Sequence, residues 1–229
     1  MIHGGWHGAW CWDRVDPLLK QAGHEVVRFD LPGHGEDRTP AVEVTLQGYT
    51  DRVVDALDAQ PEPVVLVGHS LGGIAISQAA EQRPEKIEKL VYVCALLLPS
   101  GKSASDNSQE DNDSVVFNNV EVQGDLGRIV IKEEGLKQAL YHDCPDEDFE
   151  RARRLISPQP AAPLGTPIEV TDENFGRVRR TYRTHHPRQD HQSHRPGEDV
   201  HQVALRKGRL DGYRPPTVLC RARRIGRTP

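Results

Sequence analysis

Apolar residues in the first hundred positions alternate between short continuous runs and helical spacing. The strand-like runs are residues 24–30, 64–67 and 87–93. The segments with apolar residues every three or four positions are 13–22, 45–59 and 74–82. The run at 64–67 is apolar throughout, which is typical of a strand covered on both faces. Strands that alternate with helices predict an α/β fold with a mostly parallel central sheet and helices on both faces.

The pattern changes after residue 99. Residues 100–125 are polar and rich in Asn, Asp and Ser, and short helical patterns at 135–141 and 146–156 follow with no strand between them. Four prolines then precede a return to the sheet. An insertion this long usually has a function of its own, so we expect a helical lid over the strand ends. The predicted boundaries are 1–99 for the core, 100–165 for the lid and 166–182 for the return to the core.

The segment Gly68-His69-Ser70-Leu71-Gly72 lies between the central strand-like run and a predicted helix. A serine between two such glycines is typical of a tight strand-to-helix turn that projects the hydroxyl into a pocket. A serine hydroxyl attacks a carbonyl once a base removes its proton. We therefore predict that Ser70 is a catalytic nucleophile; the alternative is a glycine-rich turn with an idle serine.

A second glycine-rich segment, HGGWHGAW at residues 3–10, follows the first predicted strand end. Acyl transfer requires hydrogen-bond donors for the oxyanion that develops on the carbonyl. Where the serine lies in a strand-to-helix turn of this kind, one donor is the backbone N–H of the residue after the serine, and the other comes from a loop after an earlier strand. We assign these donors to the backbone N–H groups of Gly5 and Leu71. We expect Gly4, Trp6 and His69 to line the substrate pocket. Histidine can act as a general base, so His3 and His7 are candidates for that role. In such loops, however, histidines more often maintain the backbone conformation through hydrogen bonds.

Composition narrows the class of protein. At 229 residues, 36% hydrophobic and 28% charged, the chain suits one globular domain. Its four cysteines lie far apart and form no metal-binding pair, so we expect no metal and a reducing, cytoplasmic location. Neither a membrane span nor a signal peptide is predicted.

Five segments together resemble the plant and bacterial methylesterase and hydroxynitrile lyase branch of the α/β hydrolases. They are HGGWHGAWCW, DLPGHGEDRTP, VVLVGHSLGG, YHDCPDEDF and PQPAAP, and the likeness runs from residue 1 to about 182. The resemblance implies hydrolysis of small esters in an apolar pocket under the lid, without cofactor. The lyases carry a threonine where this chain has Gly4, which favours an esterase over a lyase.

The resemblance ends near residue 183. The family places its catalytic acid and histidine downstream of the serine, in a TxQD-type and a DxDHxPFF-like turn, and neither occurs in place here. Residues 183–229 contain 11 Lys and Arg against 4 Asp and Glu, whereas residues 1–182 contain 18 against 30. A basic tail can bind nucleic acid. Read one nucleotide later, however, residues 187–219 can encode a helix, a strand and a turn that ends in DTDHPPFF.

We therefore interpret 183–229 as the product of a reading-frame shift near residues 182–185, with the C-terminal strand and helix of the fold lost. Three functions remain open: an ester hydrolase impaired by the missing acid and histidine, a non-catalytic binder of small molecules, and an inactive gene product. A small ester is the expected partner, with no nucleic acid and no membrane. The oligomeric state is left open, with a homodimer among the alternatives.

Overall fold

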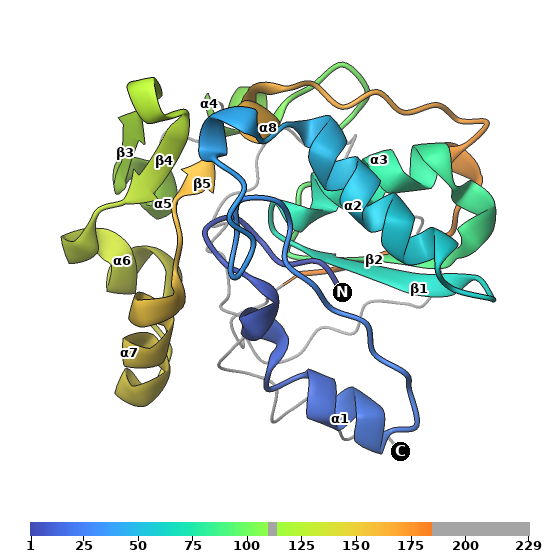
Figure 1. Ribbon diagram of the computed structural model, residues 1–229, viewed down its shortest axis with the longest axis horizontal. Helices are drawn as coiled ribbons and strands as arrows, with labels where there is room; N and C mark the ends of the chain where they lie inside the picture. The colour runs from blue at the N-terminus through green and yellow to red at the C-terminus, as the bar shows by residue number, and fades with distance from the viewer. Residues whose placement is uncertain (110–113, 185–229) are drawn as a thin grey trace, which may run out of the picture.

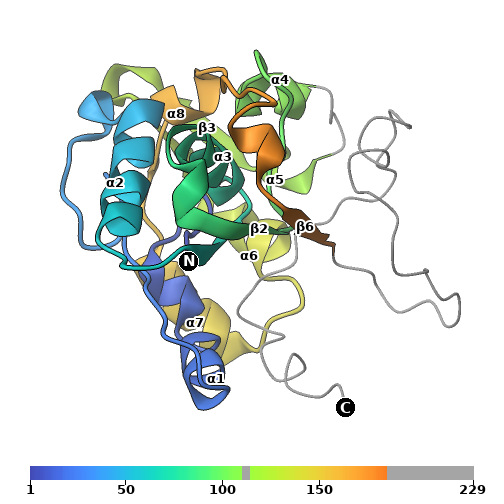
Figure 2. The ribbon, with the colours of Figure 1, turned by 90° about the vertical axis from the view of Figure 1, so that its right-hand side faces the viewer.

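The computed structural model describes residues 1–109 and 114–184. At its centre lies a parallel sheet in the order β1-β2-β6. Its strands are β1 (Val64–His69), β2 (Ile87–Val93) and β6 (Arg180–Arg183). Figure 2 shows β6 beside β2 at one edge of this sheet. Parallel strands need long crossover connections, and the chain between β1 and β2 supplies one through a helix. The predicted parallel sheet with crossover helices is confirmed.

Helices cover both faces of the sheet. The α2 (Leu46–Asp58) and α3 (Gly72–Gln82) helices lie on one side, and α1 (Asp16–Gln21) lies on the other (Figure 1). Helix α2 starts where the sequence predicts it, because the Thr45 hydroxyl accepts a hydrogen bond from the Gly48 N–H at 3.0 Å and caps its first turn. The apolar face of α2 packs on α3 and the sheet, and Tyr49, Ile74 and Leu90 are fully buried there.

Two predicted elements at the N-terminal side differ from the structure. Residues 24–30 are extended but form no strand. Their described contacts include a hydrogen bond from the Met1 amino group to the Val27 carbonyl at 2.7 Å and the packing of Phe29 on the core, whereas a strand requires a ladder of backbone hydrogen bonds. The helix predicted at 13–22 is α1, which begins only at Asp16, after the 3₁₀ turn η1 (Ala9–Trp12). Pro17 lies in its first turn, where a missing N–H costs nothing.

The segment between residues 100 and 165 contains helices and, against the prediction, strands. Its helices are α4 (Ala104–Gln109), α5 (Val115–Asn118), α6 (Glu133–Leu140), α7 (Asp146–Leu155) and α8 (Ala162–Gly165). An antiparallel sheet joins β3 (Val120–Gln123), β4 (Arg128–Ile131) and β5 (Gln159–Pro160). The turn between β3 and β4 depends on Gly127, whose φ is +58°. Short four-residue strands leave little periodicity in the sequence, which explains the wrong prediction.

Short 3₁₀ turns complete the described chain. They are η2 (Ala41–Glu43), η3 (Pro84–Lys86), η4 (Gly124–Leu126) and η5 (Phe175–Arg177).

The lid also has its own apolar contact with the N-terminal segment. Trp12 packs with Leu136 and Tyr141 in a second buried cluster, separate from the core under α2 and α3. The lid is therefore anchored on η1 as well as on the strand ends.

Candidate active site

Ser70 occupies a strained turn between β1 and α3. Its φ is +50°, a left-handed conformation that costs a residue with a side chain about 1–3 kcal/mol. Three backbone hydrogen bonds hold it there: Ser70 N–H donates to the Val93 carbonyl at 3.3 Å, and the Ser70 carbonyl accepts from Gly73 at 3.0 Å and Leu96 at 2.9 Å. The turn thus lies at the carboxyl ends of β1 and β2, where α/β sheets commonly bind ligands.

The two glycines that flank Ser70 are required by close backbone approach. A Cβ atom on Gly72 would lie 2.6 Å from the His3 carbonyl oxygen, and one on Gly68 would lie 2.9 Å from the Gly72 carbonyl oxygen. Neither contact involves a flexible side chain, so a larger residue would force the backbone apart. This packing explains in physical terms why the turn has glycine two residues before and after the serine.

The oxyanion loop, residues 3–8, lies directly against this turn. A Cβ atom on Gly4 would be 2.8 Å from the Ser70 Cβ and 2.9 Å from the His69 Nδ1. A Cβ atom on Gly5 would be 3.6 Å from a methyl group of Leu71. The structure therefore brings together five of the residues that the sequence placed in the site, although the two segments are more than sixty positions apart.

The backbone amides near Ser70 differ in their availability. The Trp6 N–H donates to the Gln159 Oε1 at 3.4 Å. Within residues 1–109 and 114–184, no group accepts a hydrogen bond from the N–H of Gly5 or of Leu71. These are the two amides predicted to stabilise an oxyanion.

The histidines of the oxyanion loop maintain its backbone conformation. A carbonyl oxygen only accepts, so Nδ1 carries the proton in both: His3 donates to the Gly4 carbonyl at 2.8 Å and His7 to the Gly5 carbonyl at 2.7 Å. Their Nε2 atoms then accept, from the Leu31 N–H at 3.0 Å and the Tyr141 hydroxyl at 2.6 Å. Burial lowers the pKa of each histidine to about 4, so both are neutral at pH 7.

The predicted pocket residues Trp6 and His69 are both buried. Trp6 has a φ of +62° and its indole donates to the Ile129 carbonyl of β4 at 3.0 Å. The His69 ring, which is 8% exposed, contacts His7 and Trp12 edge-on, with ring centroids 6.4 Å apart in each case. Aromatic rings therefore surround the base of the turn. Sequence reasoning missed Gln159, because nothing in its local sequence points toward a loop 153 positions away.

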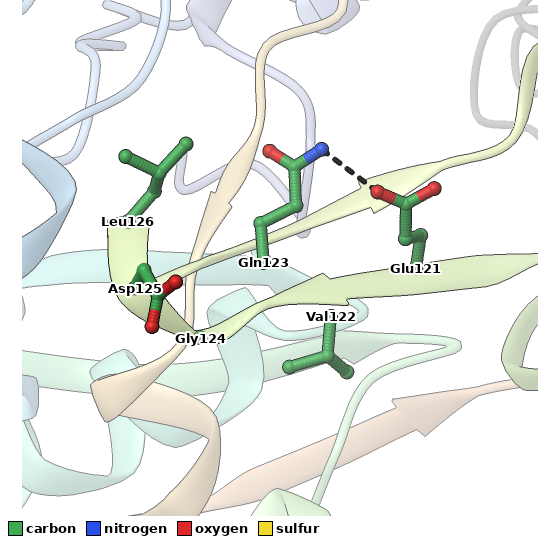
Figure 3. A pocket seen from close by; sticks show the side chains of 6 residues that line it. All are labelled: Glu121, Val122, Gln123, Gly124, Asp125 and Leu126. Carbon is green, nitrogen blue, oxygen red and sulfur yellow. Dashed lines mark hydrogen bonds between the residues drawn. The ribbon is translucent and has the colours of Figure 1, made fainter.

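A hollow in the segment between residues 100 and 165 is lined by none of the predicted site residues. Figure 3 shows a hollow of about 350 Å³ formed by residues 121–126 alone, and it contains no predicted site residue. Among the described residues, no group of three or more His, Cys, Asp or Glu could hold a metal ion. In the same part of the chain, no helix is long and apolar enough to cross a membrane.

The predicted absence of a catalytic acid and histidine concerns residues 183–229. Residues 185–229 lie outside the described residues, as does the predicted loss of the last strand and helix. Two of the described histidines near Ser70 are His3 and His7. Both ring nitrogens of each already form hydrogen bonds with other groups. The described part of the site therefore contains Ser70, the predicted nucleophile, and the Gly5 and Leu71 amides, the predicted donors.

Comparisons with known proteins identify the family of the chain. A model described as "Alpha/beta hydrolase family" matches residues 1–221. Putative methylesterase 14, chloroplastic, of Arabidopsis thaliana is 32% identical over 195 residues, which are 80% of this chain and 56% of the relative. The chain thus spans little more than half of that protein. Salicylic acid-binding protein 2 of Nicotiana tabacum is 32% identical over 80% of this chain and 75% of its own.

A solved structure shows the same fold. A pyrethroid hydrolase from Sphingobium faniae superimposes with a TM-score of 0.69 and 28% identity, over 79% of this chain and 74% of its own. The family model covers more of the chain, to residue 221.

Proposed function

The chain belongs to the alpha/beta hydrolase family, and on this premise we propose that its reaction is the hydrolysis of small carboxylic esters with Ser70 as nucleophile. The observation that carries the proposal is the geometry at the end of β1. Ser70 projects from a strained turn, and the free N–H groups of Gly5 and Leu71 lie beside it. This combination suits acyl transfer, in which negative charge develops on a carbonyl oxygen.

The proposed reaction has two steps. Ser70 Oγ attacks the ester carbonyl carbon while a base takes its proton, and the amides of Gly5 and Leu71 donate to the oxyanion. The bond between the carbonyl carbon and the alcohol oxygen then breaks, and the alcohol leaves with that proton. Water next attacks the acyl-serine, releases the carboxylic acid and restores the hydroxyl. No metal or organic cofactor takes part.

Relatives support a small ester as substrate. One matched protein is named a methylesterase, another a salicylic acid-binding protein, and the superimposed structure a hydrolase of pyrethroids. The proposed pocket wall of Gly4, Trp6 and His69 is compact and aromatic. We therefore assign a methyl ester of an aromatic acid as the substrate class. Cytoplasm remains the proposed location, although methylesterase 14 is chloroplastic by name.

The base is the part of the machinery that this chain is proposed to lack. If residues 183–229 result from a reading-frame shift, the acid and histidine of the family are encoded one nucleotide away and absent from the protein. Loss of such partners leaves an enzyme about 10³–10⁴-fold above the uncatalysed rate. The chain is then a hydrolase impaired by its tail.

Hydrolysis of p-nitrophenyl acetate tests this proposal. Four proteins are compared: the chain as it stands, a chain whose tail is translated one nucleotide later, and the Ser70→Ala variant of each. We expect the restored chain to be faster by at least about 10³-fold, with all of the gain lost on Ser70→Ala. Equal rates in the chain and the restored chain, both dependent on Ser70, would refute the impairment. Equal rates in the restored chain and its Ser70→Ala variant would refute the proposal that the reaction is ester hydrolysis by Ser70.

The name of the tobacco relative favours one alternative, a non-catalytic binder of an aromatic carboxylic acid. Calorimetry with salicylate distinguishes it from a hydrolase. Micromolar binding by the Ser70→Ala variant, together with no turnover by the restored chain, would establish the binder instead.

A further inference from the structure

We propose that Gln159 is a positioning residue that holds the oxyanion loop in its active conformation from the lid side. The inference rests on the proposed function, since it concerns the amide of Gly5 that is to receive the oxyanion. Gln159 lies on β5 and is completely buried. It is the point at which the lid meets the loop behind the nucleophile.

All polar atoms of the Gln159 side chain are engaged. Its Nε2 donates to the Pro160 carbonyl at 2.8 Å and to the Tyr49 hydroxyl at 3.1 Å. Because Nε2 carries both donors, these bonds fix which way the amide faces and leave Oε1 directed at the loop. There Oε1 accepts from the Trp6 N–H at 3.4 Å, and a Cβ on Gly5 would lie only 3.1 Å from it. The Gln159 side chain therefore lies directly against the backbone of Gly5 and Trp6 and limits its movement.

Trp6 needs this support because its backbone is strained. Its φ of +62° is unfavourable for a residue with a side chain. Besides the bond to Gln159, the Trp6 carbonyl accepts from the Ser157 N–H at 3.0 Å, and its indole donates to the Ile129 carbonyl at 3.0 Å. Every one of these partners belongs to the lid. The lid thus maintains a conformation that the loop would not keep alone.

Tyr49 anchors Gln159 to the core. The Tyr49 hydroxyl accepts from Gln159 Nε2 and pairs with His34 Nε2 at 2.8 Å, and the His34 Nδ1 lies 3.4 Å from the Ser157 hydroxyl. The connection therefore runs from α2 through two buried side chains to the lid and the loop. A buried network whose members are all paired is rigid. Such rigidity is what an oxyanion donor requires, since its contribution depends on being in place before the charge develops.

The test compares Gln159→Met with Tyr49→Phe and a matched control, Thr50→Val. Methionine has the length of glutamine without its amide. Thr50 is fully buried beside Tyr49 on α2, but its hydroxyl donates only to the Leu46 carbonyl, away from the loop. Amide hydrogen exchange of residues 4–8 without substrate is measured on the chain as it stands, and kcat and KM for p-nitrophenyl acetate are measured on the chain with the restored tail.

We expect Gln159→Met to raise exchange in the loop about tenfold and to lower kcat about 10–100-fold, with KM within about twofold, because a displaced donor weakens the transition state more than the bound ester. Tyr49→Phe should change both quantities less, and Thr50→Val neither. Unchanged exchange in Gln159→Met, or an equal loss of kcat in Thr50→Val, would overturn the inference.

The two proposals fail separately. If the restored chain shows no Ser70-dependent hydrolysis, the proposed function is refuted, while the exchange measurement still decides whether Gln159 holds the loop. If hydrolysis depends on Ser70 but Gln159→Met keeps full kcat, the function stands and Gln159 has no positioning role.

Discussion

Residues with left-handed backbone conformations gather at the carboxyl edge of the central sheet. Within the described chain, the non-glycine residues with positive φ are Trp6, Ser70 and Cys94. Cys94 directly follows β2, and its N–H donates to the Arg183 carbonyl of β6 at 2.9 Å. Each such residue costs about 1–3 kcal/mol and persists only where its surroundings hold it. The strain therefore marks the part of the molecule where geometry serves chemistry rather than stability.

Gly4 provides a direct test of how tightly the two segments fit. In Gly4→Ala, the new methyl group would lie 2.8 Å from the Ser70 Cβ, so loop and turn must separate. We expect a loss of about 1–3 kcal/mol in the free energy of unfolding, measured by urea denaturation, and a fall in Ser70-dependent hydrolysis. In the matched variant Gly165→Ala the methyl group meets nothing within 4 Å. If both variants were equally stable, the described contact would be wrong.

The buried histidines make stability depend on pH. Their pKa values of about 4 in the folded chain lie below the unfolded value of 6.5, so the unfolded state binds more protons between these values. The stabilisation is complete above pH 6.5 and is lost as the pH falls toward 4. Between pH 7 and pH 5, His3 and His7 should each lower the free energy of unfolding by about 2 kcal/mol.

Urea denaturation at both pH values, on the chain and on His7→Asn, measures this effect. Asparagine keeps a donor toward the Gly5 carbonyl but does not titrate, so the loss between pH 7 and pH 5 should shrink by about 2 kcal/mol. An identical pH dependence in His7→Asn and the unaltered chain would show that His7 is not buried as a neutral group.

At the scale of elements, α3 connects the nucleophile to the edge strand β6. Glu81, near the end of α3, accepts hydrogen bonds from the N–H of Thr171 at 2.8 Å and of Phe175 at 3.2 Å, and from the side chains of Thr171 and Asn174. This carboxylate holds residues 171–175 against α3, directly before the 3₁₀ turn η5 that leads toward β6. The position of β6 therefore depends on the helix that begins beside Ser70.

Replacing Glu81 should loosen this connection. Four donors lose their acceptor in Glu81→Ala, and we expect the free energy of unfolding to fall by about 2 kcal/mol. Hydrogen exchange should rise in residues 171–183 before it rises in β1. Glu88→Ala is the control, since Glu88 makes an exposed ion pair with Arg179 at 3.6 Å that should contribute less than about 1 kcal/mol. Equal losses in the two variants would argue against the connection.

Ion pairs join the lid helix α7 to the segment around α1. Asp13 lies between Arg28 and Arg151 and pairs with both, while Arg14 pairs with Asp148 of α7. Asp13→Asn removes the charge that the two arginines share. We expect it to destabilise the chain by about 1 kcal/mol at low salt and by less at 0.5 M NaCl, because salt screens partly exposed pairs. A loss that does not vary with salt concentration would indicate a packing effect instead.

The sequence predicts correctly those elements whose conformation is determined by residues within the element itself. Helix α2 and strands β1 and β2 lie where the sequence predicts them, because each has its own periodicity or a complete apolar run. Residues 24–30 look equally strand-like but have no ladder beside them. The strands of the lid carry four residues or fewer and take their form from pairing.

The site shows the same division. Gly68 and Ser70 are recognisable because a tight turn dictates its own residues, and Gly4 and Gly5 because close backbone approach excludes side chains. Gln159 could not be found this way. Its role arises only when the fold brings β5 against the oxyanion loop, and a buried glutamine has no sequence signature of its own.

At the scale of the whole molecule, the proposed hydrolase site has three parts: a core that would present the nucleophile, a loop that would supply the donors, and a lid that would hold the loop. The restored tail is proposed to add the base. The shifted tail is therefore proposed to leave these three parts in place and to remove proton transfer together with the last strand and helix of the fold.

Covalent labelling tests the central claim most directly. The chain and the restored chain are each incubated with a fluorophosphonate, and the labelled peptide is identified by mass spectrometry. The account predicts one adduct per chain, on Ser70, formed at least about 10³-fold faster in the restored chain and absent in Ser70→Ala. An adduct on another residue, or labelling that survives Ser70→Ala, would contradict the claim that Ser70 is the nucleophile.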